Sequence, residues 1–259
     1  MEADAVIVEI GQQHVAQVTL NRPEQLNTFN SSLARRLYAA LLALDADRDV
    51  RVVLLKGAGK AFCAGIDVNE LAGKGALEYR EWIERMERPL LAVSKMKKPV
   101  IAQLHGVAAA NGMGLAAAAD LAIAADNARM GLTAINVGLN CIGPVLPVAR
   151  CIGRKKALEL LLYGNLISAA EALAMGLVNR VVPADELEAA ARSWAAQLAQ
   201  KSPIGVQLAK SAFYHAEDMV YEKQFAYMNE AFARLCTTED ASEGVRAFFE
   251  KRKPVWKEK

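Results

Sequence analysis

The stretch PVIAQLHGVAAANGMGLAAAA, from Pro99 to Ala119, contains no Asp, Glu, Lys or Arg. A run of this length raises the question of a transmembrane span, but its polar side chains and three glycines argue against one. Pro99–Leu104 instead predicts a buried strand, and the small residues of His105–Gly114 predict a turn that leads into a helix. We therefore expect a buried strand-turn-helix unit here.

Strand patterns flank this unit on both sides. Val6–Ile10 and Val15–Leu20 are separated by four residues, which predicts a hairpin. Val50–Leu55 is mostly apolar, as in a parallel sheet that is buried on both faces. Leu121–Ala124 and Val178–Val182 are shorter candidates for strands.

Helical patterns alternate with these strands. Ser31 or Ser32 is expected to cap the first helix. Pro89 lies inside the second and predicts a kink or a break. Alternating strands and helices predict an α/β fold. The apolar faces consist of Leu33, Leu37, Leu41 and Leu44 in the first helix, and of Trp82, Met86, Leu90 and Val93 in the second.

From Glu186 onward the pattern is helical only, and no strand signal returns. A helical layer that follows an α/β core often serves contacts between subunits. No linker rich in Gly and Ser separates the two parts, so we expect them to pack together.

The composition excludes some classes of function. The 259 residues include 31 Lys and Arg against 29 Asp and Glu, and the net charge of +2 favours neither nucleic acid nor an anionic membrane as a partner. Met1–Asp4 does not resemble a secretory signal, which predicts a cytoplasmic protein. The scattered Cys63, Cys141, Cys151 and Cys236 predict free thiols and no metal site.

Two loops combine small residues and glycines at points where a strand ends. They are Lys60–Asp67 and His105–Gly114. Unpaired backbone N–H groups and a helix dipole favour negative charge at such places, so two converging loops would bind an oxyanion. Ordinary turns are the alternative interpretation. No phosphate-binding glycine motif and no G-x-S-x-G elbow occurs.

Several motifs in order resemble the crotonase, or enoyl-CoA hydratase, superfamily. They are AFCAGID at Ala61–Asp67, KPVIAQLHGVAAANGMGLAAAADLAIAADNARMG at Lys98–Gly131, GRKKALELLLYGNLISAAEALAMGLVNRVVP at Gly153–Pro183, and EKRKPVWK at Glu250–Lys257. The resemblance implies a spiral of repeated ββα units as an acyl-CoA-binding core over residues 1–199. It also implies a helical region over residues 200–259 that assembles homotrimers, often paired into homohexamers.

The resemblance also implies a site for a thioester. The backbone N–H groups of Ile66 and Asn111 would form the oxyanion hole around the thioester oxygen. Most family members have glycine where this chain has Asn111, and Asn tolerates unusual backbone angles better than most residues. Its side-chain amide is a further candidate donor.

Coenzyme A, as part of the substrate, is the only cofactor that the resemblance implies. Its adenine and phosphates would lie near Ala64 and Gly65, and Asp67 matches an acidic residue of the same loop. Lys251 would reach the nucleotide of a neighbouring subunit. Two alternatives stay open: Asp67 as the cap of the following turn, and Lys251 as a solvated terminal charge.

Both glutamates that usually catalyse the reaction in this family are missing from this chain. Gly114 and Ala134 stand at the two positions, and Gly138–Pro144, where some isomerases carry an acid, has no carboxylate. Hydration needs an acid and a base. Asn140 and Cys141 are therefore the polar groups expected to face the acyl chain, although a free Cys is more often a small buried hydrophobe.

Two further residues near the loops admit a structural interpretation. His105 is either a base or a hydrogen-bonded core histidine. Asp120 is either catalytic or a carboxylate that binds nearby backbone. We favour the structural interpretation for both.

The sequence therefore predicts an enoyl-CoA hydratase or isomerase type of enzyme, a lyase or isomerase of fatty acid metabolism. Two alternatives remain: a decarboxylase that needs mainly enolate stabilisation, and a non-catalytic acyl-CoA-binding oligomer. If the pocket is otherwise intact, Gly114→Glu with Ala134→Glu should create hydratase activity.

Overall fold

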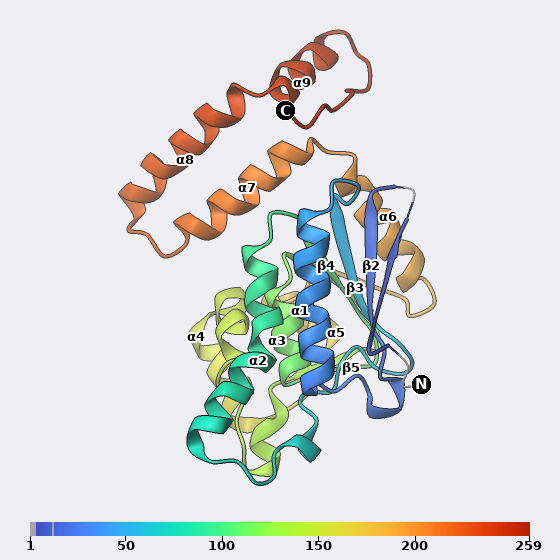
Figure 1. Cartoon of the computed structure of the whole chain (residues 1–259), viewed down its shortest axis with the longest axis vertical. Coiled ribbons are helices and arrows are strands. Elements are labelled where there is room, and N and C mark those ends of the chain that lie inside the picture. The colour runs from blue at the N-terminus through green and yellow to red at the C-terminus, as the bar shows by residue number, and fades with distance from the viewer. Residues whose placement is uncertain (1–3, 12) are drawn as a thin grey trace.

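A six-stranded sheet forms the centre of the protein, in a computed structural model that describes residues 4–11 and 13–259 (Figure 1). The strand order is β1-β2-β3-β4-β6-β9; β1 and β2 are antiparallel and all other neighbours are parallel. The parallel strands direct their carboxyl ends to one edge, where a site can form. The strands are β1 Val6–Ile10, β2 Val15–Leu20, β3 Val52–Gly57, β4 Val100–Leu104, β6 Leu121–Ala125 and β9 Arg180–Val182.

A smaller sheet lies beyond this edge. It contains β5 (Val107–Ala109), β7 (Arg129–Gly131) and β8 (Ile167–Ser168). The chain runs from β4 into β5 and from β6 into β7, so each turn gives one strand to each sheet before a helix follows. This winding is the crotonase-like spiral of ββα units that the resemblance implied.

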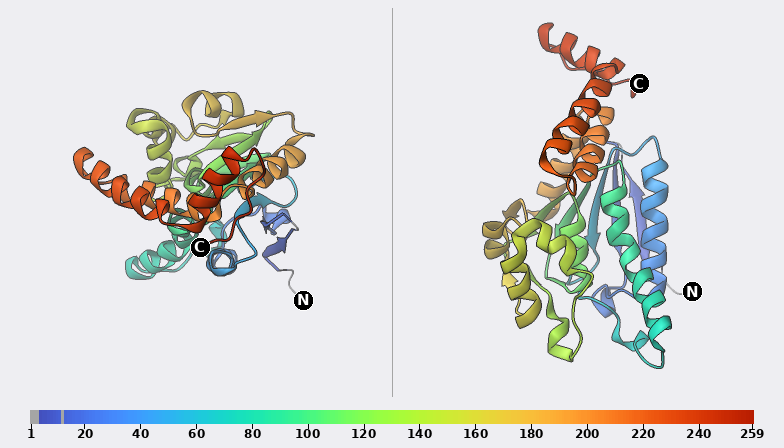
Figure 2. Two further views of the ribbon diagram at one scale, coloured as in Figure 1. Left: turned by 90° about the horizontal axis from the view of Figure 1, so that it is seen from above. Right: turned by 90° about the vertical axis from the view of Figure 1, so that its left-hand side faces the viewer.

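Helices cover both faces of the large sheet (Figures 1 and 2). On one face α1 packs on α2, α2 on α3 and α3 on α4, while α6 packs on β3 and β4 from the other face. All five residues of β4 and all eight of α3 are buried. The helices are α1 Ser31–Ala46, α2 Ala76–Lys95, α3 Asn111–Ala118, α4 Val145–Tyr163, α5 Ala169–Met175 and α6 Leu187–Ala199.

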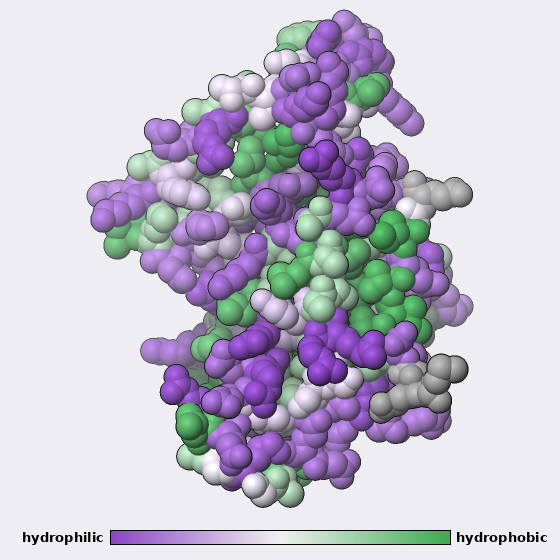
Figure 3. Space-filling view, viewed as in Figure 1, coloured by the Kyte–Doolittle hydropathy of each residue, from purple (hydrophilic) through white to green (hydrophobic). Residues whose placement is uncertain are grey.

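Three C-terminal helices extend from the end of the molecule opposite β5 (Figure 1). They are α7 (Pro203–Ala216), α8 (Tyr221–Cys236) and α9 (Glu239–Phe249), and α8 has no buried residue. Figure 3 shows apolar surface on these helices and over the edge hairpin. Among the described residues, no helix is long and apolar enough to cross a membrane. Large exposed apolar residues here include Phe213, Tyr221, Phe225, Phe232, Phe248 and Phe249.

The structure confirms most predicted elements and corrects details. All eight apolar residues predicted to face the core from the first two helices are buried. The cap prediction was wrong: Asn30, not Ser31 or Ser32, accepts from the backbone N–H of Leu33 at 2.8 Å. Helix α2 also continues through Pro89 without a break.

The predicted strands lie where expected, with shifted ends. The third strand is Val52–Gly57 rather than 50–55, and the last begins at Arg180 rather than Val178. Leu121–Ala125 is one residue longer than predicted. Residues 1–3 and Gln12, which belong to the predicted N-terminal segment and hairpin loop, lie outside the described residues.

Candidate active site

The two glycine-containing loops lie side by side, joined backbone to backbone. Cys63 forms a parallel bridge with Ala108: its N–H donates to the Val107 carbonyl at 3.1 Å, and its carbonyl accepts from Ala109 at 2.9 Å. A Cβ on Gly112 would overlap the carbonyl oxygen of Cys63. Only glycine therefore lets the start of α3 approach the first loop so closely.

This register brings the neighbourhoods of Ile66 and Asn111 together. A Cβ on Gly65 would lie 3.1 Å from the Cβ of Ala110, and the next residue on each chain segment is Ile66 or Asn111. Neither of these two backbone amides donates to an acceptor among residues 4–11 and 13–259. Both donors are free for a ligand, as an oxyanion hole requires.

The strained residue of this junction is Ala110, not Asn111. Ala110 has φ 48° and ψ −115°, whereas Asn111 is the first residue of α3 and is absent from the residues with positive φ. The tolerance of Asn for unusual backbone angles is therefore not needed at position 111. A non-glycine residue in such a region costs about 1–3 kcal/mol, and such strain is concentrated at functional sites.

The side chain of Asn111 is buried, with 2% of its surface exposed. Its Nδ2 has no hydrogen-bond partner within the described part of the chain. An unsatisfied buried amide costs about 1–3 kcal/mol, so this group stays available as a donor.

Gly114 lies one turn into α3 and is closely packed. A Cβ there would come within 2.7 Å of Pro144 Cβ and 3.0 Å of Leu90 Cδ2. Ala134 is half-buried in the short 3-10 helix Thr133–Val137. Neither position offers a polar side chain.

Asn140 and Cys141 lie at the start of the segment that leads to α4. The Asn140 side-chain oxygen accepts from the N–H of the next residue, Cys141, at 2.8 Å. Cys141 is 3% exposed and contacts the backbone of Ala134; burial raises the pKa of its thiol. Burial also raises the pKa of Cys63 to about 12. Both cysteines are therefore neutral thiols near pH 7.

Asp67 has the structural role that the sequence allowed. It caps the 3-10 helix Val68–Glu70 by accepting from the Asn69 N–H at 3.2 Å, and its Oδ2 accepts from Arg22 at 2.8 Å. The Arg22 hydrogen bond is the main cause that lowers the pKa of Asp67. Both side chains line a polar cavity of about 640 Å³.

The predicted coenzyme A residues do not all meet within one chain. Ala64 donates to the Leu26 carbonyl at 3.0 Å and lies with Gly65 in the first loop. Lys251 is exposed and follows the last residue of α9 by two positions, and α9 lies at the end of the molecule opposite β5 (Figure 1). Within one chain, Lys251 and this loop therefore lie at different ends of the molecule.

His105 and Asp120 are held by other groups. His105 Nε2 donates to the Gly59 carbonyl at 3.0 Å, and burial lowers the pKa of its ring. Asp120 accepts from the Val100 N–H and from Lys210 Nζ, each at 2.7 Å. These contacts agree with the structural interpretation of both residues.

Sequence reasoning missed Asn27, which holds the first loop in place. It is fully buried, and its Nδ2 donates to the carbonyls of Ala58 and Ala61, both at 2.8 Å. Its Oδ1 accepts from the Arg22 N–H at 2.8 Å. An Asn close after the Arg22-Pro23 turn was the available signal, because Asn side chains often stabilise turns.

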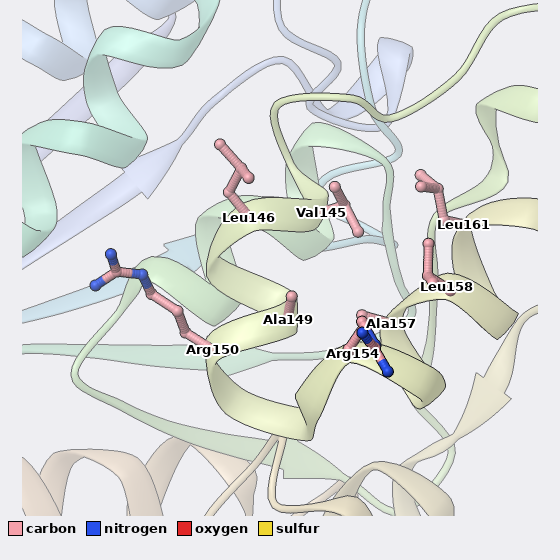
Figure 4. Close-up of a pocket in the computed structure, with 8 residues that line it drawn as sticks. All are labelled: Val145, Leu146, Ala149, Arg150, Arg154, Ala157, Leu158 and Leu161. Carbon is pink, nitrogen blue, oxygen red and sulfur yellow. The ribbon is translucent and has the colours of Figure 1, made fainter. Parts of the chain in front are cut away.

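A second cavity of about 470 Å³ lies along α4 (Figure 4). Gly153, at φ 76°, bends the helix there, and apolar side chains from both halves line the cavity with Arg150 and Arg154. Neither this cavity nor the one beside Asp67 is lined by Ile66 or Asn111.

Known proteins resemble the chain over nearly its whole length. The sequence model of the family described as enoyl-CoA hydratase/isomerase matches residues 11–259. The (E)-benzylidenesuccinyl-CoA hydratase of Thauera aromatica is 38% identical over 246 residues, 94% of this chain and 96% of that protein.

Solved structures agree with this match. A crystal structure of an enoyl-CoA hydratase from Mycobacterium smegmatis superposes with a TM-score of 0.94 at 36% identity, covering 97% of this chain and 98% of that one. Human enoyl coenzyme A hydratase domain-containing protein 3 gives 0.93 at 31% identity, covering 97% of this chain and all of that one.

A spiral of ββα units with two loops joined at the strand ends defines a crotonase-fold protein. The chain belongs to the enoyl-CoA hydratase/isomerase family of the crotonase superfamily. Its expected substrates are accordingly acyl-CoA thioesters.

Proposed function

We propose that this protein binds an acyl-CoA thioester and stabilises its enolate between the backbone amides of Ile66 and Asn111. The observation that carries the proposal is that two adjoining segments each offer an unpaired N–H at this junction. Removing one oxyanion-hole donor typically costs about 3–4 kcal/mol of transition-state stabilisation.

The setting of α3 strengthens this proposal. The helix begins at Asn111, is buried along its length and has no acidic residue in its first turn. Its dipole therefore favours negative charge at the junction, and low local polarity increases the effect.

We further propose that Asn111 Nδ2 adds a side-chain donor to the backbone pair, because it is buried and unpaired. Asn111→Gly keeps the backbone amide and removes this group. The variant should bind and turn over acyl-CoA more weakly, and unchanged binding and turnover would exclude a role for the side chain.

Coenzyme A is proposed to lie along Ala64, Gly65 and Asp67, beside the Arg22 cavity. Lys251 would come from a second copy in a homotrimer or homohexamer, since one chain keeps it away from this loop. The exposed aromatic side chains of α8 and α9 support assembly, because apolar patches of this kind mark interaction surfaces. Sedimentation measures whether the protein forms a trimer or a hexamer, and substitution of Lys251 tests whether this residue contributes to coenzyme A binding.

The reaction is proposed to be of the hydratase/isomerase type without efficient water addition, because Gly114 and Ala134 supply no acid. Decarboxylation of a malonyl-type thioester is the second candidate. It needs mainly stabilisation of the enolate, so it does not require an acid at Gly114 or Ala134. An oligomer that binds acyl-CoA without turnover is the third.

One set of assays separates these functions. Purified protein is mixed with crotonyl-CoA and the enoyl-thioester absorbance is followed, then malonyl-type and 3-enoyl thioesters are assayed, and coenzyme A binding is measured. Turnover of 3-enoyl thioester supports the proposal. Decarboxylation alone supports the second candidate, tight binding without turnover the third, and absence of both binding and turnover contradicts all three.

A further inference from the structure

Glu87 on α2 places a carboxylate next to the loop in which an acid is missing. Its Oε1 occupies the space where a Cβ on Gly143 would stand. Gly143 lies in the segment Gly138–Pro144, which contains no carboxylate of its own. The absence of a side chain at Gly143 is what allows the carboxylate to lie against the loop backbone.

Glu87 also belongs to the wall that encloses Gly114. Leu90, one helical turn after Glu87, lies 3.0 Å from a Cβ position on Gly114, and Pro144, the neighbour of Gly143, lies 2.7 Å from it. Gly114 in turn is three residues after Asn111, hence on the same face of α3. Glu87 therefore shares one wall with the position of the missing first glutamate.

The carboxylate is free to react. Within residues 4–11 and 13–259, Glu87 takes part in no hydrogen bond or ion pair that meets ordinary distance limits, and its oxygens are not completely enclosed. On the same helix, Glu84 instead pairs with Arg88 at 3.2 Å on the surface. A half-buried carboxylate without a partner is costly, which is typical of functional groups.

We propose that Glu87 is the catalytic carboxylate of this site and that the protein moves the double bond of a 3-enoyl-CoA to the 2-position. The inference rests on the proposed thioester site, and it replaces the two missing glutamates by one carboxylate from a different helix. One carboxylate suffices because isomerisation returns the proton that it removes, whereas hydration needs both an acid and a base.

The proton balance is closed. The Glu87 carboxylate removes a proton from C2, and the electron pair of the C–H bond moves toward the thioester oxygen, where the amides of Ile66 and Asn111 stabilise the dienolate. The carboxylic acid then returns the proton to C4, and the double bond re-forms between C2 and C3. No water, oxidant or reductant enters the reaction.

Burial raises the pKa of Glu87 above its usual value. A carboxylate with a higher pKa is a stronger base, and general acid–base groups work best when their pKa lies near the working pH. This direction agrees with the role that the geometry assigns.

The test compares Glu87→Gln with Glu84→Gln, which removes a carboxylate from the exposed side of the same helix. Glu87→Gln should lower kcat for a 3-enoyl-CoA by about 10²–10⁴-fold and abolish exchange of the C2 proton with solvent deuterium, with little change in KM. Glu84→Gln should change neither. Glu87→Asp keeps the charge on a shorter side chain and should retain partial activity.

The outcomes separate this inference from the proposed function. If wild-type protein isomerises the substrate and folded Glu87→Gln stays within about 3-fold of it, Glu87 is not the base although the thioester site stands. If Glu87→Gln does not fold, a kcat of Glu87→Asp equal to wild type would contradict the inference in the same way. If wild-type protein binds no coenzyme A and turns over no thioester, both proposals fail.

Discussion

Pro144 fills the space that a side chain at position 114 would need. Its Cβ lies 2.7 Å and its Cα 2.9 Å from the point where a Cβ on Gly114 would stand. A backbone atom at this distance cannot move aside as the end of a flexible side chain would. The packing of Pro144 and Leu90 around Gly114 therefore leaves no room for a glutamate side chain at this position.

This wall changes the expected result of restoring both acids. Gly114→Glu with Ala134→Glu should hydrate crotonyl-CoA no faster than wild type, because the new side chain at position 114 must displace Pro144. The absorbance assay measures this directly. Rapid hydration by the double variant would show that Pro144 moves aside at little cost and would contradict this prediction.

Gly114→Ala isolates the packing effect at the same position. It should lower the free energy of unfolding by about 1–3 kcal/mol, as overpacked cores usually do, even though Ala favours a helix more than Gly does. Urea denaturation checks this. A variant more stable than wild type would contradict the close contact with Pro144.

Gly112→Ala tests the junction of the two loops. The new Cβ would overlap the Cys63 carbonyl oxygen, which already accepts from Ala109. We expect the loops to separate, with a loss of several kcal/mol in unfolding free energy or of at least about tenfold in coenzyme A affinity. Gly75→Ala, at an exposed helix start with ample room, is the control and should change both by little. A Gly112→Ala variant with unchanged stability and unchanged coenzyme A binding would contradict the close approach of the two loops and their role as the thioester site.

The fold was predictable where composition leaves few alternatives. Pro99–Leu104 carries no charge and precedes a glycine-containing turn, which favoured a buried strand over a transmembrane span, and β4 confirms the strand. The spacing of Leu33, Leu37 and Leu41 likewise left one helical face for the core. The spacing of apolar residues predicts burial well, because only the face of a helix that packs on the core must be apolar.

Finer features were not predictable, since they depend on distant contacts. Asn30, Ser31 and Ser32 are all good caps, and only the observed backbone selects Asn30. Glu87 looks like a solvent-exposed helix residue until the loop at Gly143 is placed against it. The positive φ of Ala110 at the start of α3 could not be predicted from the sequence either.

Lys210 is another residue that the sequence did not single out, and it anchors α7 to the core. It is 9% exposed, and its Nζ donates to the carbonyls of Val93 and Lys98 at 2.8 and 2.9 Å as well as to Asp120. Lys210→Met leaves the Asp120 carboxylate, which is 14% exposed, without its cation, and this should cost up to about 3–5 kcal/mol of unfolding free energy. Thermal or urea denaturation measures it.

The control for this pair is Lys156→Met, which removes a cation whose pair with Glu159 is exposed. It should cost less than about 1 kcal/mol. Asp120→Leu combined with Lys210→Met should cost less than the sum of the single changes, because neither charge is then left alone. A loss below about 1 kcal/mol for Lys210→Met would exclude the anchoring role.

Glu188 on α6 gives the stability a defined dependence on pH. Burial raises its pKa, but hydrogen bonds from Gln103, Lys56 and Arg192 outweigh burial and lower the pKa to about 2. In the unfolded chain the value is about 4.3. The folded state therefore binds the proton less readily, so the stabilisation is complete above about pH 5 and is lost as the pH falls toward 2.

Glu188→Gln should accordingly lower the free energy of unfolding by no more than about 1 kcal/mol at pH 7, because the carboxylate is 42% exposed and its ion pairs are screened. The difference from wild type should shrink between pH 5 and pH 3, since the unfolded wild-type chain binds a proton at Glu188 in this range while the folded protein, in which the pKa of Glu188 is about 2, does not. Urea denaturation at pH 7, 5, 4 and 3 measures this, with Glu159→Gln as an exposed control. A difference that stays constant or grows as the pH falls would mean that the three donors do not lower the pKa of Glu188.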